Sequence, residues 1–185
     1  NPGEHFTPRD VVHLMVDLML AGDEAEIGAK KAIRTVYDPC CGSGGMFVQS
    51  AHFIERMKKN PSEQATFYGM EKNPTTIRLG KMNLAVHGLE GNIVKALSYY
   101  DDNHELVGKA DFVMANPPFN MKEWGADKLQ DDVRWKYGIP PSGNANFAWL
   151  QHMIHHLSPN GKIGMVLANG SLSSQSGGEG TIREN

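Results

Sequence analysis

The sequence has 185 residues, of which 40% are hydrophobic and 21% are charged. This length suits one compact domain with its own core and is short for two. Eighteen basic and 21 acidic residues give a net charge of −3, whereas a free-standing protein that holds DNA by neutralising phosphates is normally basic. Either nucleic acid is not the ligand, or another chain supplies much of the contact with it.

The two cysteines, Cys40 and Cys41, are adjacent in the chain. This excludes a disulfide framework and fits a reducing cytosol. No apolar run approaches the ~18 residues of a membrane span, so we expect a cytoplasmic protein without a membrane partner. Because the chain begins with Asn1 rather than Met and ends in a polar segment, we expect it to be a fragment of a longer protein.

Short apolar runs alternate with amphipathic segments, which predicts an α/β fold with a mostly parallel sheet. Thr7 can cap a first helix with Pro8 at its first position. The apolar face of this helix is predicted to contain Val11, Val12, Met15, Leu18 and Met19. Strands are predicted at residues 35–38, 66–71, 91–97, 110–115 and 162–168, and further helices at about 46–59, 73–88 and 145–157. The segment from 171 to 180 is rich in Ser and Gly and is expected to be mobile.

The turn after the first predicted strand contains Gly42, Gly44 and Gly45, so the backbone there can approach a ligand closely. Asp38 ends this strand, and Glu71 ends the second. Open parallel sheets bind ligands at the carboxyl ends of their strands, and an acid at the end of the second strand can accept both hydroxyls of a ribose. Taken alone, the pattern also fits a plain tight turn and a surface Glu.

Two other phosphate-binding patterns fit this turn poorly. No Gly-Lys-Ser/Thr follows, as a P-loop requires, and the glycine spacing differs from the dinucleotide fingerprint. An acid before the glycines would also repel a pyrophosphate. Asp38 instead suits a ligand with a cationic end, such as the ammonium group of an amino acid. A nucleoside joined to an amino acid is S-adenosylmethionine, which we therefore predict as the cofactor.

A second candidate site, Asn116-Pro117-Pro118-Phe119, directly follows the fourth predicted strand. The two prolines fix φ and remove two N–H donors, but their carbonyl oxygens remain acceptors. The side-chain carbonyl of Asn116 is another acceptor, and Phe119 offers a flat ring. Together these groups can hold a planar amino group and stack its base. The alternative is a strand that ends in proline and places Phe119 in the core.

The long segment from Asn120 to Asn144 follows, and structureless segments of this length are usually functional or disordered. Trp124, Trp135 and Tyr137 either line a bound base or DNA, or only hold the segment in place. Three histidines lie on the next predicted helix, without a Cys or acid at ligand spacing. We therefore predict no metal site and expect these histidines to be solvated or to cap the helix.

With these motifs in this order, the chain resembles the γ-type amino-methyltransferases, and more closely the modification (M) subunits of type I restriction-modification systems. The matching segments are Gly3 to Arg9, Asp38 to Met46, Asn116 to Asn120, Asn144 to Phe147 and Asn169 to Leu172. The resemblance implies a Rossmann-like class I SAM-dependent methyltransferase fold. Its mostly parallel, twisted sheet would be flanked by helices and truncated here. The whole chain, residues 1–185, would form a single catalytic domain.

The resemblance implies that a methyl group passes from S-adenosylmethionine to the N6 amine of adenine in DNA. The matching catalytic residues are Asn116, Pro117, Pro118 and Phe119. The matching cofactor-binding residues are Phe6, Thr7, Asp38, Gly42, Ser43, Gly44, Gly45, Glu71, Ala96, Leu97 and Asn116. Many relatives have Asp in the turn after the third strand. This chain departs from that pattern, so backbone groups at Ala96 and Leu97 are expected to serve instead.

In this interpretation, the side-chain carbonyl of Asn116 and the backbone carbonyl of Pro117 accept the two amine hydrogens. Phe119 stacks on an adenine that has flipped out of the duplex, and the segment 120–144 lies near that base. The implied partners are DNA, the specificity subunit that reads its sequence, and the restriction subunit of a type I complex. Two alternatives stay open: methylation of a protein glutamine or an RNA adenine, and a non-catalytic scaffold that only holds the cofactor.

Overall fold

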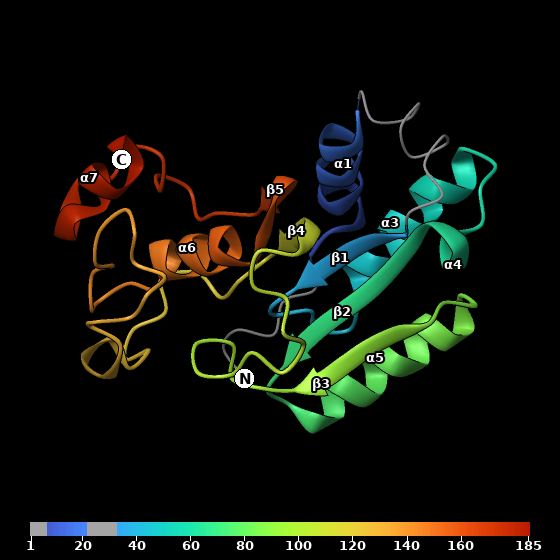
Figure 1. The fold of residues 1–185 in the computed structure, drawn as a ribbon, viewed down its shortest axis with the longest axis horizontal. Coiled ribbons are helices and arrows are strands. Elements are labelled where there is room, and N and C mark those ends of the chain that lie inside the picture. Colours follow the sequence, from blue (N-terminus) through green and yellow to red (C-terminus); the bar gives the residue numbers. More distant parts are fainter. Residues whose placement is uncertain (1–6, 22–32) are drawn as a thin grey trace. The chain divides into compact units, whose positions relative to one another are not determined.

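The computed structural model describes residues 7–21 and 33–185, which form two compact units (Figure 1). Of these described residues, unit 1 comprises those up to Ala115 together with His156–Gly164, and unit 2 comprises Asn116–His155 and Met165–Asn185. Within the described residues, no helix is long and apolar enough to cross a membrane.

Unit 1 is built on a five-stranded sheet with the order β3-β2-β1-β4-β5. Its elements, in chain order, are α1 (Arg9–Leu20), β1 (Arg34–Asp38), α3 (Gly45–Arg56), α4 (Pro61–Gln64), β2 (Ala65–Glu71), α5 (Pro74–Val86), β3 (Gly91–Lys95), β4 (Ala110–Ala115) and β5 (Leu157–Met165), whose last residue belongs to unit 2. The pairs β1–β2, β1–β4 and β2–β3 are parallel. The predicted α/β fold with a mostly parallel sheet is therefore confirmed.

The main core of unit 1 lies between one face of the sheet and the helices α1, α3 and α5. Alternate residues of a strand point to opposite faces, so each strand contributes every second side chain to this core. The strand residues in it include Val36, Phe67, Ile93 and Phe112. Each fully buried side chain of this size stabilises the fold by roughly 1.5–3 kcal/mol. Figure 1 shows α5 running beside β3, to which it packs.

The opposite face of the sheet carries Tyr37, whose ring centroid lies 5.1 Å from that of His156. The Nε2 atom of His156 lies 3.4 Å from a carboxylate oxygen of Asp102, and the side chain is 2% exposed. The expectation of a solvated or capping histidine was therefore wrong for His156. A ring that packs on the sheet is buried there and finds its polar partner in the neighbouring loop.

Local signals define the ends of several helices. Asn73 caps α5, since its side chain accepts a hydrogen bond from the Thr75 N–H, and Pro74 occupies the first helical position. At α1, however, the cap prediction was wrong, because Pro8 is the N-cap residue and no side chain caps the helix. The Pro8 carbonyl oxygen accepts hydrogen bonds from the N–H groups of Val11 and Val12. The helix therefore begins at Arg9, one position later than predicted.

The buried face of α1 also differs in part from the prediction. Val12, Val16, Met19 and Leu20 are buried, whereas the expected core residues Val11 and Leu18 are 41% and 68% exposed. Both sets of residues recur at helical spacing, so periodicity alone does not separate them. Packing against α3 decides which set turns inward.

Strand β5 covers residues 157–165 instead of the predicted 162–168, and it includes Pro159 and Gly161. Both residues normally break strands. Proline is tolerated here because β5 lies at the edge of the described sheet. Gly161 is required by close packing, since an added Cβ would lie 2.7 Å from the Ala110 carbonyl oxygen. The third strand is also shorter than predicted and ends at Lys95.

Unit 2 contains η1 (Ala126–Lys128), most of α6 (Asn146–His156), η2 (Ser176–Gly178) and α7 (Glu179–Glu184). The segment 171–180, which was expected to be mobile, contains η2 and the first residues of α7. Ile182 is 7% exposed and lies against Gly138, where an added Cβ would be 3.1 Å from it. The Arg183 guanidinium donates a hydrogen bond of 3.2 Å to the Ser171 carbonyl oxygen. These contacts hold a segment whose composition alone suggested no structure.

Candidate active site

The glycine turn joins β1 to α3 and lies entirely within unit 1. Gly42 and Gly44 have φ angles of +53° and +78°, in the left-handed region that favours glycine. Gly44 is the N-cap residue of α3, and its N–H donates to the Cys41 carbonyl oxygen at 2.8 Å. The Cys41 N–H in turn donates to the Met70 carbonyl oxygen at 3.0 Å. The turn is therefore tied both to its own helix and to the neighbouring strand β2.

The space around the turn distinguishes glycines that pack from glycines that face open space. A Cβ added at Gly42 or Gly45 would meet no atom within 4 Å. Gly45 is the first residue of α3, and its φ lies outside the left-handed region, so alanine would suit this position better in the isolated chain. A ligand that approaches the backbone would explain the missing side chain. The turn therefore fits the close approach that a nucleoside-type cofactor requires.

Helix α5 packs closely against the turn, which the sequence analysis did not predict. A Cβ added at Gly80 would lie 3.1 Å from the Gly42 carbonyl oxygen and 3.0 Å from the Ile93 Cδ1 atom. The Asn83 amide donates a hydrogen bond of 2.9 Å to the Ser43 carbonyl oxygen. The signal available in the sequence was a glycine inside a helical pattern, which often has a packing reason.

Asp38 is the most perturbed carboxyl group at the site. It ends β1, is 2% exposed, and its Oδ1 accepts a hydrogen bond of 2.9 Å from the Cys40 N–H. Burial raises the pKa of Asp38 from 3.8 to about 7, the negative charge of Glu71 adds to this rise, and the Cys40 N–H opposes it. An ammonium group bound nearby would favour the ionised form, as expected for a residue that holds a cationic ligand.

Glu71 ends β2 at the same edge of the sheet. Asp38 is paired in register with Gly69, and Glu71 is paired with Lys95 of β3. The carboxylate of Glu71 is half-buried and accepts a hydrogen bond of 2.8 Å from the Asn73 N–H. The structure thus places the two predicted acids on adjacent strands, close enough for the charge of one to raise the pKa of the other.

The turn after β3 contains a carboxylate that the sequence analysis left without a role. The Leu97 N–H donates a hydrogen bond of 2.8 Å to the Asp101 carboxylate, and the Ala96 N–H donates to the Glu71 carbonyl oxygen at 3.1 Å. Both N–H groups are therefore engaged inside the protein. Asp101 is brought back to this position because the chain turns at Leu97, whose carbonyl oxygen accepts from Tyr100.

The Asn116–Phe119 motif begins unit 2. Asn116 directly follows Ala115, the last residue of β4, and β4 lies next to β1 in the sheet. Asn116 is half-buried, Pro117 is buried, and Pro118 is exposed. Phe119 is 45% exposed, so the alternative of a core Phe is excluded. An exposed ring beside two proline carbonyls is available to stack on a ligand.

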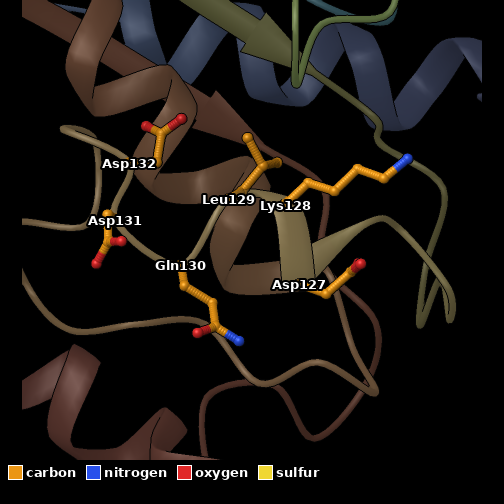
Figure 2. Close-up of a pocket in the computed structure, with 6 residues that line it drawn as sticks. All are labelled: Asp127, Lys128, Leu129, Gln130, Asp131 and Asp132. Atoms are coloured by element: carbon orange, nitrogen blue, oxygen red, sulfur yellow. The ribbon is translucent and has the colours of Figure 1, made fainter.

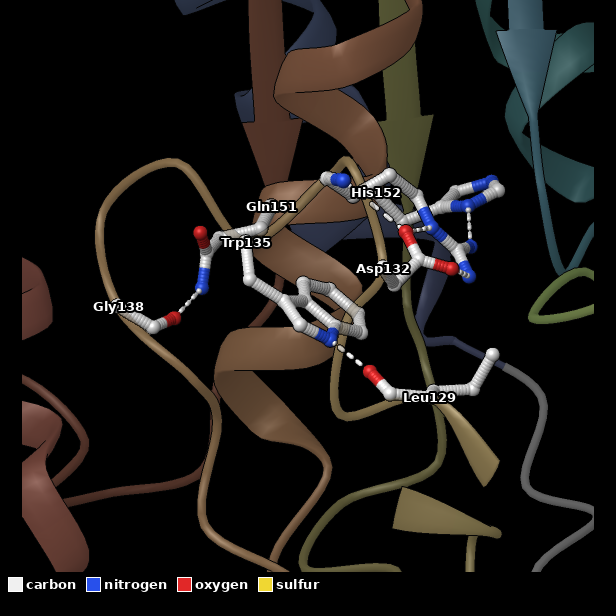
Figure 3. A network of polar contacts seen from close by, with 7 residues as sticks. Leu129, Asp132, Trp135, Gly138, Gln151 and His152 are labelled. Atoms are coloured by element: carbon white, nitrogen blue, oxygen red, sulfur yellow. Dashed lines mark hydrogen bonds and ion pairs between the residues drawn. The ribbon is translucent and has the colours of Figure 1, made fainter. Parts of the chain in front are cut away.

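The tryptophans of the segment 120–144 pack within unit 2. Trp124 and Trp135 are 4% and 9% exposed, with their ring centroids 6.0 Å apart in an edge-to-face arrangement. The indole N–H of Trp124 donates to the Pro141 carbonyl oxygen. The indole N–H of Trp135 donates to the Leu129 carbonyl oxygen, as Figure 3 shows. Of the two interpretations of these tryptophans, the structure supports the one in which they hold the segment in place.

A buried arginine, which the sequence analysis did not single out, ties this segment to α6. The Arg134 guanidinium donates two hydrogen bonds to the Asp132 carboxylate, at 2.7 and 2.8 Å, and one of 2.9 Å to His152 Nδ1. His152 is 1% exposed, so the expectation of a solvated or capping histidine was wrong here also. These hydrogen bonds hold the pKa of Asp132 below its ordinary value. Gln151 of the same helix donates to the Gly138 carbonyl oxygen at 2.7 Å (Figure 3).

An open pocket in unit 2 contains none of the predicted site residues. It is lined by Asp127, Lys128, Leu129, Gln130, Asp131 and Asp132. Figure 2 shows that these side chains point in different directions rather than converging on one position. One of them, Asp132, is already paired with Arg134. We assign no ligand to this pocket.

The first expected cofactor contacts are only partly described. Phe6 lies outside the described residues, and Thr7 is half-buried just before α1.

Within residues 7–21 and 33–185, no three His, Cys, Asp or Glu side chains are grouped as metal ligands would be.

The parallel sheet and the glycine turn after its first strand define a Rossmann-like fold of the class I SAM-dependent methyltransferase type. A putative class I S-adenosylmethionine-dependent methyltransferase from Listeria monocytogenes has this fold, with a TM-score of 0.70 at 13% identity over 93% of this chain and 51% of its own. The chain belongs to the N-6 DNA methylase family, whose model matches residues 1–185.

The most similar relatives include methylase subunits of type I restriction enzymes. The chain is 50% identical to the HindI methylase subunit of Haemophilus influenzae and 41% identical to the MjaIX methylase subunit of Methanocaldococcus jannaschii, covering 98% of this chain in each case. It spans 39% and 31% of these relatives. A type I restriction-modification methyltransferase subunit from Streptococcus thermophilus gives a TM-score of 0.82 at 31% identity, over 98% of this chain and 38% of its own. These findings confirm the resemblance predicted from the motifs.

Proposed function

We propose that the protein containing this chain transfers a methyl group from S-adenosylmethionine to the N6 amine of adenine in DNA, as the modification subunit of a type I restriction-modification system. The family match and the names of the similar relatives support this reaction. The observation that carries the proposal is the position of the Asn116–Phe119 motif. It directly follows β4, and β4 lies beside β1, the strand that ends in Asp38 and the glycine turn.

S-adenosylmethionine, when bound, supplies an electrophilic methyl group on a sulfonium. The buried Asp38 would receive the ammonium group of the methionine part, because a cation there favours the ionised carboxylate. Glu71 would accept the ribose hydroxyls at the end of β2. The open faces of Gly42 and Gly45 leave room for the ligand beside the backbone. Ser43 and Gly44 would complete the proposed cofactor site, with Phe6 and Thr7 at the start of the chain. Ala96 and Leu97 would border it without offering their N–H groups, which Glu71 and Asp101 already hold.

The chemical task of the Asn116–Phe119 motif is to make a poor nucleophile reactive. The lone pair of the adenine amine is delocalised into the purine ring. The side-chain carbonyl of Asn116 and the backbone carbonyl of Pro117 would accept the two amine hydrogens, which favours a tetrahedral nitrogen and exposes its lone pair. Phe119, with its half-exposed ring, would stack on the flipped adenine and contribute roughly 1–3 kcal/mol. Holding the reacting groups in line supplies most of the acceleration.

The two units would act together as a single catalytic domain, with the segment 120–144 near the target base. The specificity subunit would read the DNA sequence, and the restriction subunit would complete the complex. A net charge of −3 is consistent with this division, because a chain without a basic surplus needs a partner to hold DNA.

A methyl-transfer assay tests the proposal. The full-length protein, assembled with its specificity subunit, is incubated with tritiated S-adenosylmethionine and DNA, RNA or protein. Label is expected in DNA, as N6-methyladenine after digestion. Asn116→Ala is expected to abolish transfer while leaving cofactor binding near the wild-type value. Label in RNA or protein alone would indicate another substrate. Calorimetric binding of the cofactor without transfer to any substrate would identify a scaffold.

A further inference from the structure

Within unit 2, Asn120 belongs to a hydrogen-bonded cluster with Asn144, Asn146 and Ser171. Its N–H donates a hydrogen bond of 2.9 Å to Asn146 Oδ1, and its Oδ1 accepts hydrogen bonds from the amides of Asn146 and Asn144, at 3.1 and 3.3 Å. The Asn146 amide also lies 3.4 Å from the Ser171 hydroxyl. These residues come from the motif segments around 144–147 and 169–172, so the cluster joins parts of the chain that are far apart in sequence.

Asn120 immediately follows Phe119 and has an unusual backbone conformation. Its φ is +50°, in the left-handed region that costs a non-glycine residue of the order of 1–2 kcal/mol. Asparagine tolerates this region better than most residues. The side chain of Asn146 accepts a hydrogen bond from the Asn120 N–H and donates one to the Asn120 Oδ1 atom. The surrounding cluster therefore maintains a conformation that the chain would not prefer by itself.

Asn146 is well suited to act as the fixed point of this cluster. It is the first residue of α6 and is 4% exposed. Its own N–H donates a hydrogen bond of 2.9 Å to Asn144 Oδ1. The N–H of the preceding residue, Ala145, donates a hydrogen bond of 3.1 Å to the Met121 carbonyl oxygen. A buried amide with both ends bonded has little freedom to move, so it transmits the position of α6 to the segment after Phe119.

We propose that Asn146 is a positioning residue for the target base. It holds Asn120 in place, and Asn120 in turn restricts the orientation of the neighbouring Phe119 ring, which would stack on the base. The inference rests on the proposed methyl transfer. Pro117 and Pro118 restrict the backbone before Phe119, and Asn120 restricts it afterwards. Since the backbone sets the direction of the Cα–Cβ bond and limits the χ1 rotamers, restricting it on both sides of Phe119 restricts where the half-exposed ring can lie.

The test uses the full-length protein with its specificity subunit and a duplex that carries the complex's own modification sequence, identified by sequencing methylated genomic DNA. Asn146→Ala is expected to lower kcat on the order of 10²-fold, the size of effect that misplacing a reacting group produces. The fluorescence of 2-aminopurine at the target position should also differ from that in the wild-type complex. The Kd for S-adenosylmethionine should stay unchanged. Asn60→Ala, which removes the asparagine side chain that caps α4 in unit 1, is the matched control and should leave kcat near the wild-type value.

A wild-type kcat and 2-aminopurine signal in Asn146→Ala would overturn the inference while the proposed reaction stood. An equal loss of cofactor binding and kcat would also overturn it, because that pattern indicates general structural damage. If Asn146→Ala does not fold, the exposed Asn120 decides the matter. Asn120→Ala should lower kcat more than Asn120→Gly, since glycine adopts the left-handed conformation without strain; equal effects would overturn the inference. Failure of the wild-type complex to methylate DNA would instead contradict the proposed reaction.

Discussion

Gly80 of α5 lies so close to Gly42 of the glycine turn that a Cβ on Gly80 would be only 3.1 Å from the Gly42 carbonyl oxygen. The Asn83 amide, one helical turn further along α5, donates to the Ser43 carbonyl oxygen. The helix after β2 therefore shapes the turn after β1. Gly80 and Asn83 do not contact the cofactor in the proposed function, but they would influence its binding through the position of the glycine turn.

Gly80→Ala should destabilise unit 1 and displace the glycine turn. An alanine would normally favour a helix by about 1 kcal/mol, but here the added methyl group meets a backbone oxygen and the Ile93 side chain. Overpacking of this kind costs about 1–3 kcal/mol. Thermal unfolding and cofactor calorimetry on the full-length protein should both show a loss. Leu79→Ala, at a neighbouring exposed position, is the control. A Gly80→Ala variant as stable as the wild type, with the same affinity, would contradict the packing argument.

Gly45→Ala should have the opposite effect on stability. The added Cβ meets nothing within 4 Å, and alanine suits a helix better by about 1 kcal/mol, so Tm should stay constant or rise. Affinity for S-adenosylmethionine should fall, because the methyl group would occupy space proposed for the ligand. Gly143→Ala is a matched control, since its added Cβ also meets nothing within 4 Å. Unchanged affinity in Gly45→Ala would argue against close approach at this residue.

Asp38 should make stability depend on pH in an unusual direction. Its folded pKa of about 7 lies above the ordinary 3.8, so the folded state binds the extra proton between these values. Stability contributed by the neutral carboxyl is present below about pH 4 and is lost as pH rises through about 7. Asp38→Asn should therefore be more stable than the wild type at pH 8, by at most about 4 kcal/mol, and no more stable near pH 4. Unfolding measured across this range checks the sign.

The same substitution should weaken the cofactor. Asp38→Asn keeps an oxygen for the Cys40 N–H but removes the charge that would pair with an ammonium group. A charged hydrogen bond contributes about 1.5–3 kcal/mol, which corresponds to roughly a 10- to 100-fold rise in Kd. In the wild type, affinity should increase as pH rises through about 7 and Asp38 ionises, and this dependence should disappear in Asp38→Asn. A pH dependence that persists in the variant would assign it to another group.

Arg134→Met should loosen the segment around residues 126–138 without affecting the cofactor. The substitution leaves Asp132 and the buried His152 without the guanidinium that joins them. An unsatisfied buried polar group costs about 1–3 kcal/mol. Hydrogen exchange should become faster in this segment and stay unchanged in β1 and β2. Asp132→Asn, which keeps the shape of the side chain, should have a smaller effect. Uniformly faster exchange throughout the protein would mean that the contact stabilises more than the segment.

Sequence patterns alone were enough to predict the parallel sheet of unit 1, the glycine turn, the acids at the ends of β1 and β2, and the motif after β4. These features depend on local signals: apolar runs of strand length, helix caps such as Asn73, and glycines that permit positive φ. Such signals act within a few residues, so they can be recognised without knowing what packs against them.

Long-range packing, by contrast, determines which face of α1 is buried, why Gly80 must be small, and that Trp124 and Trp135 pack inside unit 2. It also brings Asn146 into hydrogen-bonding contact with Asn120, which lies 26 residues earlier in the chain. Each of these outcomes depends on contacts between segments far apart in sequence. A hydrophobic period or a residue type does not specify its partner, so those pairings follow only when the whole core has formed.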